Sequence, residues 1–331
     1  MADRIKLIQI SSTAWEHPAD RAALNTLRSI PGFDVVVRKI ASFFGEIGIR
    51  QLFLANAVKV GPNQRPKLWA IYQEVLDTMD WPEVPELYVT QTPLANAAAV
   101  GFDKPFIVMN SALLELLEEE EQREILGHEL GHIMSGHTTY TTIAIILMTI
   151  GFQNLPFLAG VAILPFQLAL MEWYRKAELS ADRAGLLSTQ SPRTSMSTFL
   201  KMAGGRRYDD TISVEEFQIQ AREYETQGNV ADRVWQVINT AFRTHPFGTV
   251  RAAELQRWID SGGYDKIILG DYRRRDDAAR PSLGSDLEDA AGYYGDQAKE
   301  AMATISGVLG RARDAFESAF KTSSEEDKPN E

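Results

Sequence analysis

Residues 120–137 read EEQREILGHELGHIMSGH and contain two histidines, His128 and His132, with Glu129 between them. If this stretch is a helix, the two histidines lie one turn apart on the same face, so that their imidazoles can share one metal ion. A zinc ion held by two imidazoles and one further protein ligand keeps a position for water and lowers the pKa of that water towards ~7. Glu129 lies beside this position and can act as a general base. The stretch therefore predicts a hydrolytic zinc site.

Two features of the sequence strengthen this prediction. Acidic residues crowd the start of the stretch, where negative charge favours a helix N-terminus, and no proline interrupts it. A motif this short can arise by chance, which is the simplest alternative. However, the chain has only five histidines, and three of them lie within ten residues, at His128, His132 and His137. This clustering favours a metal site.

The composition excludes several other classes of protein. The chain has 331 residues, 44% of them hydrophobic, and its net charge of −11 argues against nucleic acid, which needs a concentrated basic surface. Because there is no cysteine, any zinc must be bound by histidine and carboxylate. Residues 1–30 lack the basic start and apolar core of a signal peptide, so we expect the catalytic part in the cytoplasm.

Residues 86–109 differ from their surroundings in being rich in β-prone residues. Residues 1–82, which precede them, read as helices broken by turns. Within 86–109, three short apolar runs separated by turn residues predict a small antiparallel sheet. An exposed edge strand of such a sheet can bind an extended peptide. A purely structural sheet is the alternative, and the local sequence does not decide between the two.

The chain after the histidine motif is unusually apolar. For 39 residues after His132 there is no Asp, Glu, Lys or Arg. If residues 132–152 and 156–178 form two helical arms, the arms would be about 30 Å and about 33 Å long, and the second would return the chain close to His132 at Glu178. Glu178 can then be the third metal ligand, and Asp182, one turn later, can accept a hydrogen bond from a ligand imidazole. A solvated helix face with an acid pair is the alternative.

The motif HELGH at residues 128–132 and the motif ELSAD at residues 178–182 together resemble the gluzincin peptidases. The resemblance is to the family of the heat-shock membrane endopeptidase (HtpX-like) and the CAAX prenyl endopeptidase. It implies a helical metallopeptidase domain with one zinc ion per chain. The roles that it implies are zinc ligands at His128, His132 and Glu178, a base at Glu129 and a supporting carboxylate at Asp182.

Two further stretches are similar to this family. Residues 93–101 resemble its substrate-aligning edge strand, which implies that Asn96, Ala97 and Ala98 bind the substrate, although Ala98 replaces the usual aromatic residue. His245 lies in a His-Pro segment like that of the family, which implies that it stabilises the oxyanion, with a helix cap or a buried contact as the alternative. Because three protein ligands and one water fill a tetrahedral site, we expect a structural or ligand-supporting role for the third clustered histidine, His137.

The sequence of the apolar residues 138–172 does not decide whether they insert in a membrane. Relatives in the heat-shock group carry transmembrane helices at this place, and Trp173 and Tyr174, followed by Arg175 and Lys176, are typical of a membrane interface. Against insertion, the first arm is rich in threonine and the second contains prolines. We therefore expect a hairpin that packs in the protein or lies against a membrane surface, with insertion in the cytoplasmic membrane as the alternative.

The predicted organisation has an N-terminal helical part, a peptidase core and a more polar C-terminal part. The N-terminal part is 1–82, and the core is 83–263. Within the core we expect the edge sheet 86–109, the zinc helix 120–137, the apolar hairpin 138–172 and the third-ligand helix 173–187. The C-terminal part consists of a linker 264–285, an amphipathic helical segment 286–320 and a disordered tail 321–331. An apolar stripe over residues 299–320 packs on the core in the simplest interpretation. Self-association or contact with the membrane is the alternative.

We therefore predict a mainly α protein (α+β) with zinc as its cofactor and a peptide or protein as its substrate. The predicted function is a zinc-dependent metalloendopeptidase that hydrolyses internal peptide bonds, with a role in protein quality control at or near the membrane. One alternative is a zinc-containing protein that binds unfolded chains at its sheet edge without cleaving them, although Glu129 argues against it. Another alternative is a metal-dependent hydrolase of a non-peptide bond.

Overall fold

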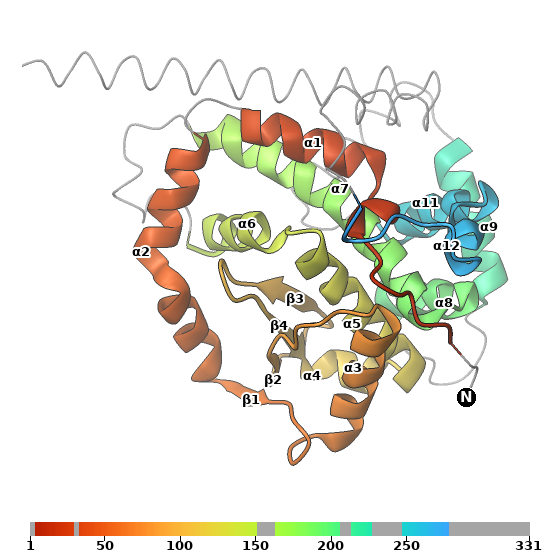
Figure 1. Cartoon of the computed structure of the whole chain (residues 1–331), viewed down its shortest axis with the longest axis horizontal. Coiled ribbons are helices and arrows are strands. Elements are labelled where there is room, and N and C mark those ends of the chain that lie inside the picture. Colours follow the sequence, from red (N-terminus) through yellow and green to blue (C-terminus); the bar gives the residue numbers. More distant parts are fainter. Residues whose placement is uncertain (1–3, 30–32, 151–162, 206–212, 227–246, 278–331) are drawn as a thin grey trace, which may run out of the picture.

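A computed structural model describes residues 4–29, 33–150, 163–205, 213–226 and 247–277 (Figure 1). Most of these residues are helical and one small sheet lies among the helices, which confirms the predicted mainly α class. The helices are α1 (Pro18–Ser29), α2 (Phe33–Leu54), α3 (Pro66–Thr78), α4 (Ser111–Leu116), α5 (Glu119–Met134), α6 (Thr138–Ile150), α7 (Ile163–Thr189), α8 (Pro192–Gly204), α9 (Val214–Thr226), α11 (Gly248–Asp260) and α12 (Gly263–Ile268), with a short 3-10 helix, η1, at Ser12–Ala14.

The sheet has four strands, in the order β1 (Ala57–Lys59), β2 (Leu87–Thr90), β4 (Phe106–Asn110) and β3 (Ala97–Val100). The outer strands β1 and β3 pair antiparallel with their neighbours, but β2 and β4 are parallel, so the sheet is mixed and the prediction of an antiparallel sheet is wrong for this pair. The first four residues of β4 are all buried, which suits a central strand. Its central position leaves β3 as an edge strand.

The sheet separates two apolar cores, because alternate residues of a strand point to opposite faces. On one face, Leu87 and Val89 pack with buried residues of α3, α5 and α8. On the other face, Tyr88 and Val108 pack with buried residues of α1, α2 and α6. The long helix α7 contributes to both cores, and α1 lies along it (Figure 1).

Helix α5 carries the histidine motif and is shorter than predicted. At its start, the side chain of Glu121 accepts a hydrogen bond from the backbone N–H of the N-cap residue. At its end, Gly136 adopts a left-handed φ of 69°, and the backbone N–H of His137 donates to the C=O of His132 at 2.9 Å. The predicted helix 120–137 therefore extends too far at its C-terminal end, and His137 lies just before α6.

Helices α5 and α7 approach each other closely because small residues line their contact. A Cβ atom added to Gly127 would lie 2.0 Å from Ser188 Oγ, and one added to Gly131 would lie 2.5 Å from the Cβ of Ala184. The two glycines are one turn apart, and each directly precedes one of the two histidines. The glycines therefore set the distance between the two helices beside the motif. This close approach brings the carboxylates of α7 to the histidines of α5.

The predicted apolar hairpin 138–172 corresponds to α6 and the first part of α7, and its tip, residues 151–162, lies outside the described residues. Ile143 in α6 and Leu170 in α7 are fully buried; α6 packs against α2 and α7 packs against α1. Trp173 and Tyr174 are buried as well, so their interpretation as membrane-interface residues is wrong. Among the helices that the structure describes, none has the length and apolar character needed to cross a bilayer.

The C-terminal part of the described chain packs against the N-terminal part. Within the predicted linker 264–285, residues 264–277 include most of α12, and Arg274 forms a β-bridge with Ile10. Residues 264–277 are therefore folded and packed on the N-terminal part, which a free linker would not be. The rest of the predicted linker, the helical segment 286–320 with its apolar stripe and the tail 321–331 lie outside the described residues.

Candidate metal centre

Three side chains meet where α5 and α7 cross. His128 and His132 come from α5 and Glu178 comes from α7, and one ligand atom of each lies within 4.8 Å of the others. Nε2 of His128 is 3.5 Å from Glu178 Oε2, and Nε2 of His132 is 3.3 Å from Glu178 Oε1. All three side chains are buried. Two imidazoles and one carboxylate are the donor set of a catalytic zinc site, so the residues present fit a zinc ion.

The second ring nitrogen of His128 is held by a carboxylate. His128 Nδ1 lies 3.1 Å from Asp182 Oδ1, and Nε of Arg251 on α11 donates to Asp182 Oδ2 at 2.9 Å. Burial raises the pKa of Asp182, but the charge and hydrogen bonds of Arg251 more than offset this, so that the pKa lies below its usual value. Asp182 is therefore an anion that can accept the Nδ1–H of His128, which leaves the Nε2 lone pair for a metal.

The second ring nitrogen of His132 lies beside another histidine. Nδ1 of His132 is 3.1 Å from Nδ1 of His137, and Nε2 of His137 is 3.1 Å from Oδ2 of Asp20 on α1. Trp173 and Ser180, both on α7, donate hydrogen bonds to the Asp20 carboxylate. Burial raises the pKa of Asp20, but the adjacent His137 and the hydrogen bonds lower it below its usual value. Both candidate ligand histidines are thus linked to a buried carboxylate, one directly and one through His137.

Glu129 is buried beside the candidate ligands. Only 5% of the residue is exposed, and its Oε2 has no hydrogen-bond partner among the described residues. Burial raises the pKa of the Glu129 carboxyl, whereas His128 and His132 act in the opposite direction. A carboxylate oxygen that binds no protein donor can accept a proton from a water molecule, as a general base must.

The edge strand β3 lies against α5 and α6. The C=O of Asn96 accepts a backbone hydrogen bond from β4 at 2.9 Å, so Asn96 and Ala98 direct their backbone groups to β4. Ala97 and Ala99 direct theirs to the outer edge, and the backbone N–H of Ala99 is close enough to Glu129 to lower its pKa. Of the three predicted substrate residues, Ala97 is therefore the one whose backbone faces outward.

Sequence reasoning missed two residues that lie behind the candidate ligand histidines, Arg251 and Asp20. Arg251 carried a weak signal, because it follows the His-Pro segment, but its contact with Asp182 was not foreseen. Asp20 carried no signal that pointed to a metal site. The remaining predicted site residue, His245, lies outside the described residues.

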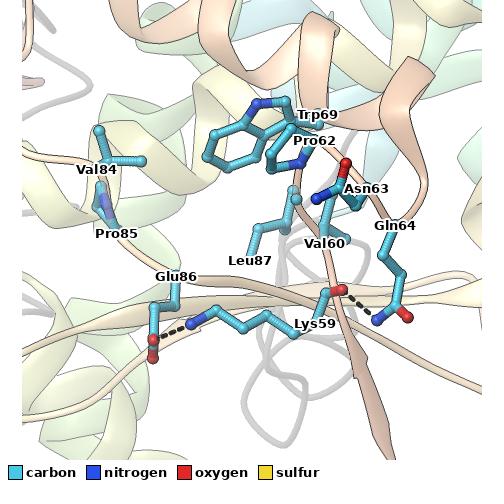
Figure 2. A pocket seen from close by; sticks show the side chains of 11 residues that line it. Lys59, Val60, Pro62, Asn63, Gln64, Trp69, Val84, Pro85, Glu86 and Leu87 are labelled. Carbon is cyan, nitrogen blue, oxygen red and sulfur yellow. Dashed lines mark hydrogen bonds and ion pairs between the residues drawn. The ribbon is translucent and has the colours of Figure 1, made fainter.

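A separate pocket of about 630 Å³ lies at the opposite edge of the sheet, between β1, β2 and the start of α3 (Figure 2). Trp69, Pro62 and Leu87 line it, and Lys59 forms an ion pair with Glu86 beside them. None of the predicted site residues lines this pocket. It is therefore not part of the candidate metal centre.

Comparison with known proteins points to one family. The family model described as peptidase family M48 matches residues 62–259. The plastoglobule-localized metallopeptidase 48 of Arabidopsis thaliana, a chloroplastic protein, is 33% identical over 259 residues, which cover 77% of this chain and 74% of that protein. A protease HtpX homologue of Tropheryma whipplei is 25% identical over 50% of this chain and 65% of its own length, and one of Moorella thermoacetica is 25% identical over 62% and 76%. No solved structure matches the chain.

Proposed function

The chain belongs to peptidase family M48 and is a metallopeptidase, as its motifs indicated, and from this premise we propose that it is a zinc-dependent endopeptidase. In the proposed site, His128, His132 and Glu178 hold the zinc ion and Glu129 is the general base. The observation that carries the proposal is the convergence of two imidazoles and one carboxylate within 4.8 Å, beside a buried glutamate with a free oxygen. Histidine and glutamate ligands suit a catalytic zinc site, which keeps a position open for water.

Each side chain has one task in the proposed mechanism. When bound, zinc acidifies a water molecule and polarises the peptide carbonyl. The Glu129 carboxylate takes a proton from the attacking water and later donates it to the nitrogen of the leaving amine, so that one water is added across the peptide bond. Asp182, held by Arg251, keeps His128 in the tautomer with a free Nε2. His245 remains our proposal for a donor to the oxyanion.

We place the substrate, a peptide or protein, along the outer edge of β3. The backbone groups of Ala97 and Ala99 face this edge, and Ala99 adjoins Glu129, so a peptide added to the sheet as a further strand would pass the base. Asn96 and Ala98 would then support the strand from its inner side. A protein that only binds unfolded chains would use the same edge, but Glu129 would have no task in it.

Digestion of an unfolded protein tests the proposed function. Purified protein with zinc is expected to cut reduced casein at internal peptide bonds, which mass spectrometry of the fragments would identify. A chelator such as 1,10-phenanthroline should abolish the cuts, and zinc should restore them where magnesium and calcium do not, because the site offers nitrogen ligands. Cleavage that survives complete metal removal would contradict the proposal. The absence of any cut in a peptide library would favour the hydrolase of a non-peptide bond.

We also propose that the protease works at or near a membrane, on its cytoplasmic side, in protein quality control. Phe43 and Ile47 on the outer face of α2 are 62% and 75% exposed, and one relative is named for its plastoglobule location. Self-association through residues 299–320 also stays a prediction, because they lie outside the described residues.

Fractionation of cells tests the membrane location. Protein held only at the surface should leave the membrane fraction in a carbonate wash, whereas protein inserted through residues 138–172 should stay. Recovery of all the protein in the soluble fraction, without detergent and before any wash, would show that the membrane proposal is wrong.

A further inference from the structure

The side chains behind His132 have no task in the mechanism above, and we propose that they fix the orientation of this ligand from the N-terminal helix. In this relay, His132 Nδ1–H donates to His137 Nδ1, and His137 Nε2–H donates to Asp20 on α1. His137 and Asp20 are positioning residues, because they act on the metal centre only through His132. The inference rests on the proposed function, since it requires that His132 binds the metal.

The ring nitrogens of His132 and His137 can each either donate or accept, and only one assignment of donors and acceptors satisfies all of them once His132 binds a metal. Nε2 of His132 is 3.3 Å from Glu178 Oε1, on the side where the ligand atoms converge. A ligand nitrogen carries no proton, so a neutral His132 carries its proton on Nδ1, 3.1 Å from His137 Nδ1. His137 must then accept at Nδ1 and donate from Nε2, which lies 3.1 Å from Asp20 Oδ2. Every ring nitrogen in the relay thus has one partner.

The far end of the relay is firmly held. Asp20 is 1% exposed, its Oδ1 accepts from Trp173 Nε1 at 3.1 Å, and its Oδ2 accepts from Ser180 Oγ at 2.5 Å. The ring of Trp173 also packs edge-on against His137, with 5.6 Å between the ring centres. The backbone N–H of His137 donates to the C=O of His132, which fixes the position of His137 at a second point. A fixed acceptor of this kind restricts the rotation of the ligand ring.

The relay gives α1 a place in the metal centre. The two ligand histidines are supported in parallel ways, because His128 reaches Asp182 directly and His132 reaches Asp20 through His137. Asp20 precedes residues 62–259, the segment that the family model matches. The N-terminal helix therefore contributes to zinc binding from outside that segment.

Two replacements of His137 distinguish a role in orienting His132 from a role in packing alone, because the two roles predict opposite orders of zinc affinity. His137→Phe keeps a ring against Trp173 but removes the acceptor, whereas His137→Asn keeps an acceptor at the position of Nδ1 but loses ring contacts. If the relay orients His132, zinc affinity measured by competition with a chelator should fall about 10- to 100-fold in His137→Phe and by less in His137→Asn. A packing role predicts the reverse order.

A second variant tests the Asp20 end. Asp20→Leu should weaken zinc binding in the same direction, and adding it to His137→Phe should cost little more, because both break one relay. If either variant does not fold, as judged by its thermal unfolding, Asp20→Asn removes the charge at nearly constant size and should still weaken zinc binding. The matched control is Tyr72→Phe on α3, since Tyr72 is also buried but its hydroxyl donates to the C=O of Pro85, away from the relay, and the zinc affinity of this variant should stay within about twofold of the wild type.

The outcomes separate this inference from the proposed function. If the wild type binds no zinc, or if His132→Ala binds it normally, the zinc site itself is wrong. If the wild type binds zinc through His132 but His137→Phe and Asp20→Leu bind it equally well, the site stands and the relay is overturned.

Discussion

Replacing Glu129 by glutamine is expected to lower kcat by about 10²- to 10⁴-fold while zinc and substrate still bind. An amide has the shape of the carboxylate, but it does not take a proton from water at neutral pH. Because Glu129 is not one of the three residues whose ligand atoms converge, the variant should keep about one zinc ion per chain. Steady-state kinetics on a peptide found in the digestion experiment, with metal analysis of the same sample, measure both quantities.

The control for this variant is Glu124→Gln, on the same helix. Glu124 is buried like Glu129, its carboxyl accepts a hydrogen bond from Thr189 Oγ1 at 3.0 Å, and it is not one of the three residues whose ligand atoms converge. Burial raises the pKa of Glu124 to about 8, so the group is largely neutral at pH 7 and the amide replaces it without a change of charge. We expect kcat within about twofold of the wild type, because no proton is exchanged with the substrate here.

The kinetics of Glu129→Gln also distinguish the rival functions. If cleavage continued at the wild-type rate, Glu129 would not be the base, and the assignment of its role would be wrong. If the wild type bound unfolded chains with zinc present but cut none of them, the non-cleaving binder would be the better description. A loss of zinc together with activity would mean that Glu129 holds the site together, and the drop in kcat would then say nothing about proton transfer.

Much of the metal centre follows from helix periodicity and chain length. A spacing of four residues places His128 and His132 on one helix face. The charge-free stretch after them has the length of two helical arms, so it returns Glu178 and Asp182 to the histidines. The structure does bring these four side chains together. These inferences needed only local rules and the rise per residue of a helix.

The partners behind the ligands depend on which helix faces meet, and local rules do not specify this. Asp20 lies in the first turn of α1, where an acidic residue has an ordinary explanation in its favourable interaction with the helix N-terminus. Its contact with His137 exists because α1 packs along α7, so that Trp173 and Ser180 hold it in place. The same limit applies to Arg251, which meets Asp182 only through the packing of α11.

The sheet and the end of the histidine helix show two further kinds of error. Three consecutive β-prone runs suggested a simple antiparallel order, but β4 lies between β2 and β3, because the order of strands in space need not follow the sequence. A strand as short as β1 carries almost no periodic signal. The end of α5, by contrast, had a readable signal in Ser135-Gly136, since glycine often ends a helix in the left-handed conformation.

Replacing Glu178 by alanine is expected to remove zinc from the protein. The wild type, purified without added metal, should contain about one zinc ion per chain, and Glu178→Ala should contain almost none after dialysis, because two imidazoles alone leave a zinc site incomplete. Zinc should also raise the unfolding temperature of the wild type and leave that of the variant nearly unchanged, since a ligand stabilises only the state that binds it. Glu124→Gln serves again as the control and should keep its zinc.

Full occupancy in Glu178→Ala would contradict the three-ligand site. His137 would then be the nearest alternative in the sequence, but its nitrogens face His132 and Asp20, so it could bind the metal only if the relay broke and its ring turned. Adding His137→Phe to Glu178→Ala would decide this, because zinc that disappears only in the double variant must have been held by His137. If zinc were absent from both the wild type and Glu178→Ala, another metal would be favoured. Adding different metals back to the chelated protein in the digestion experiment would identify it.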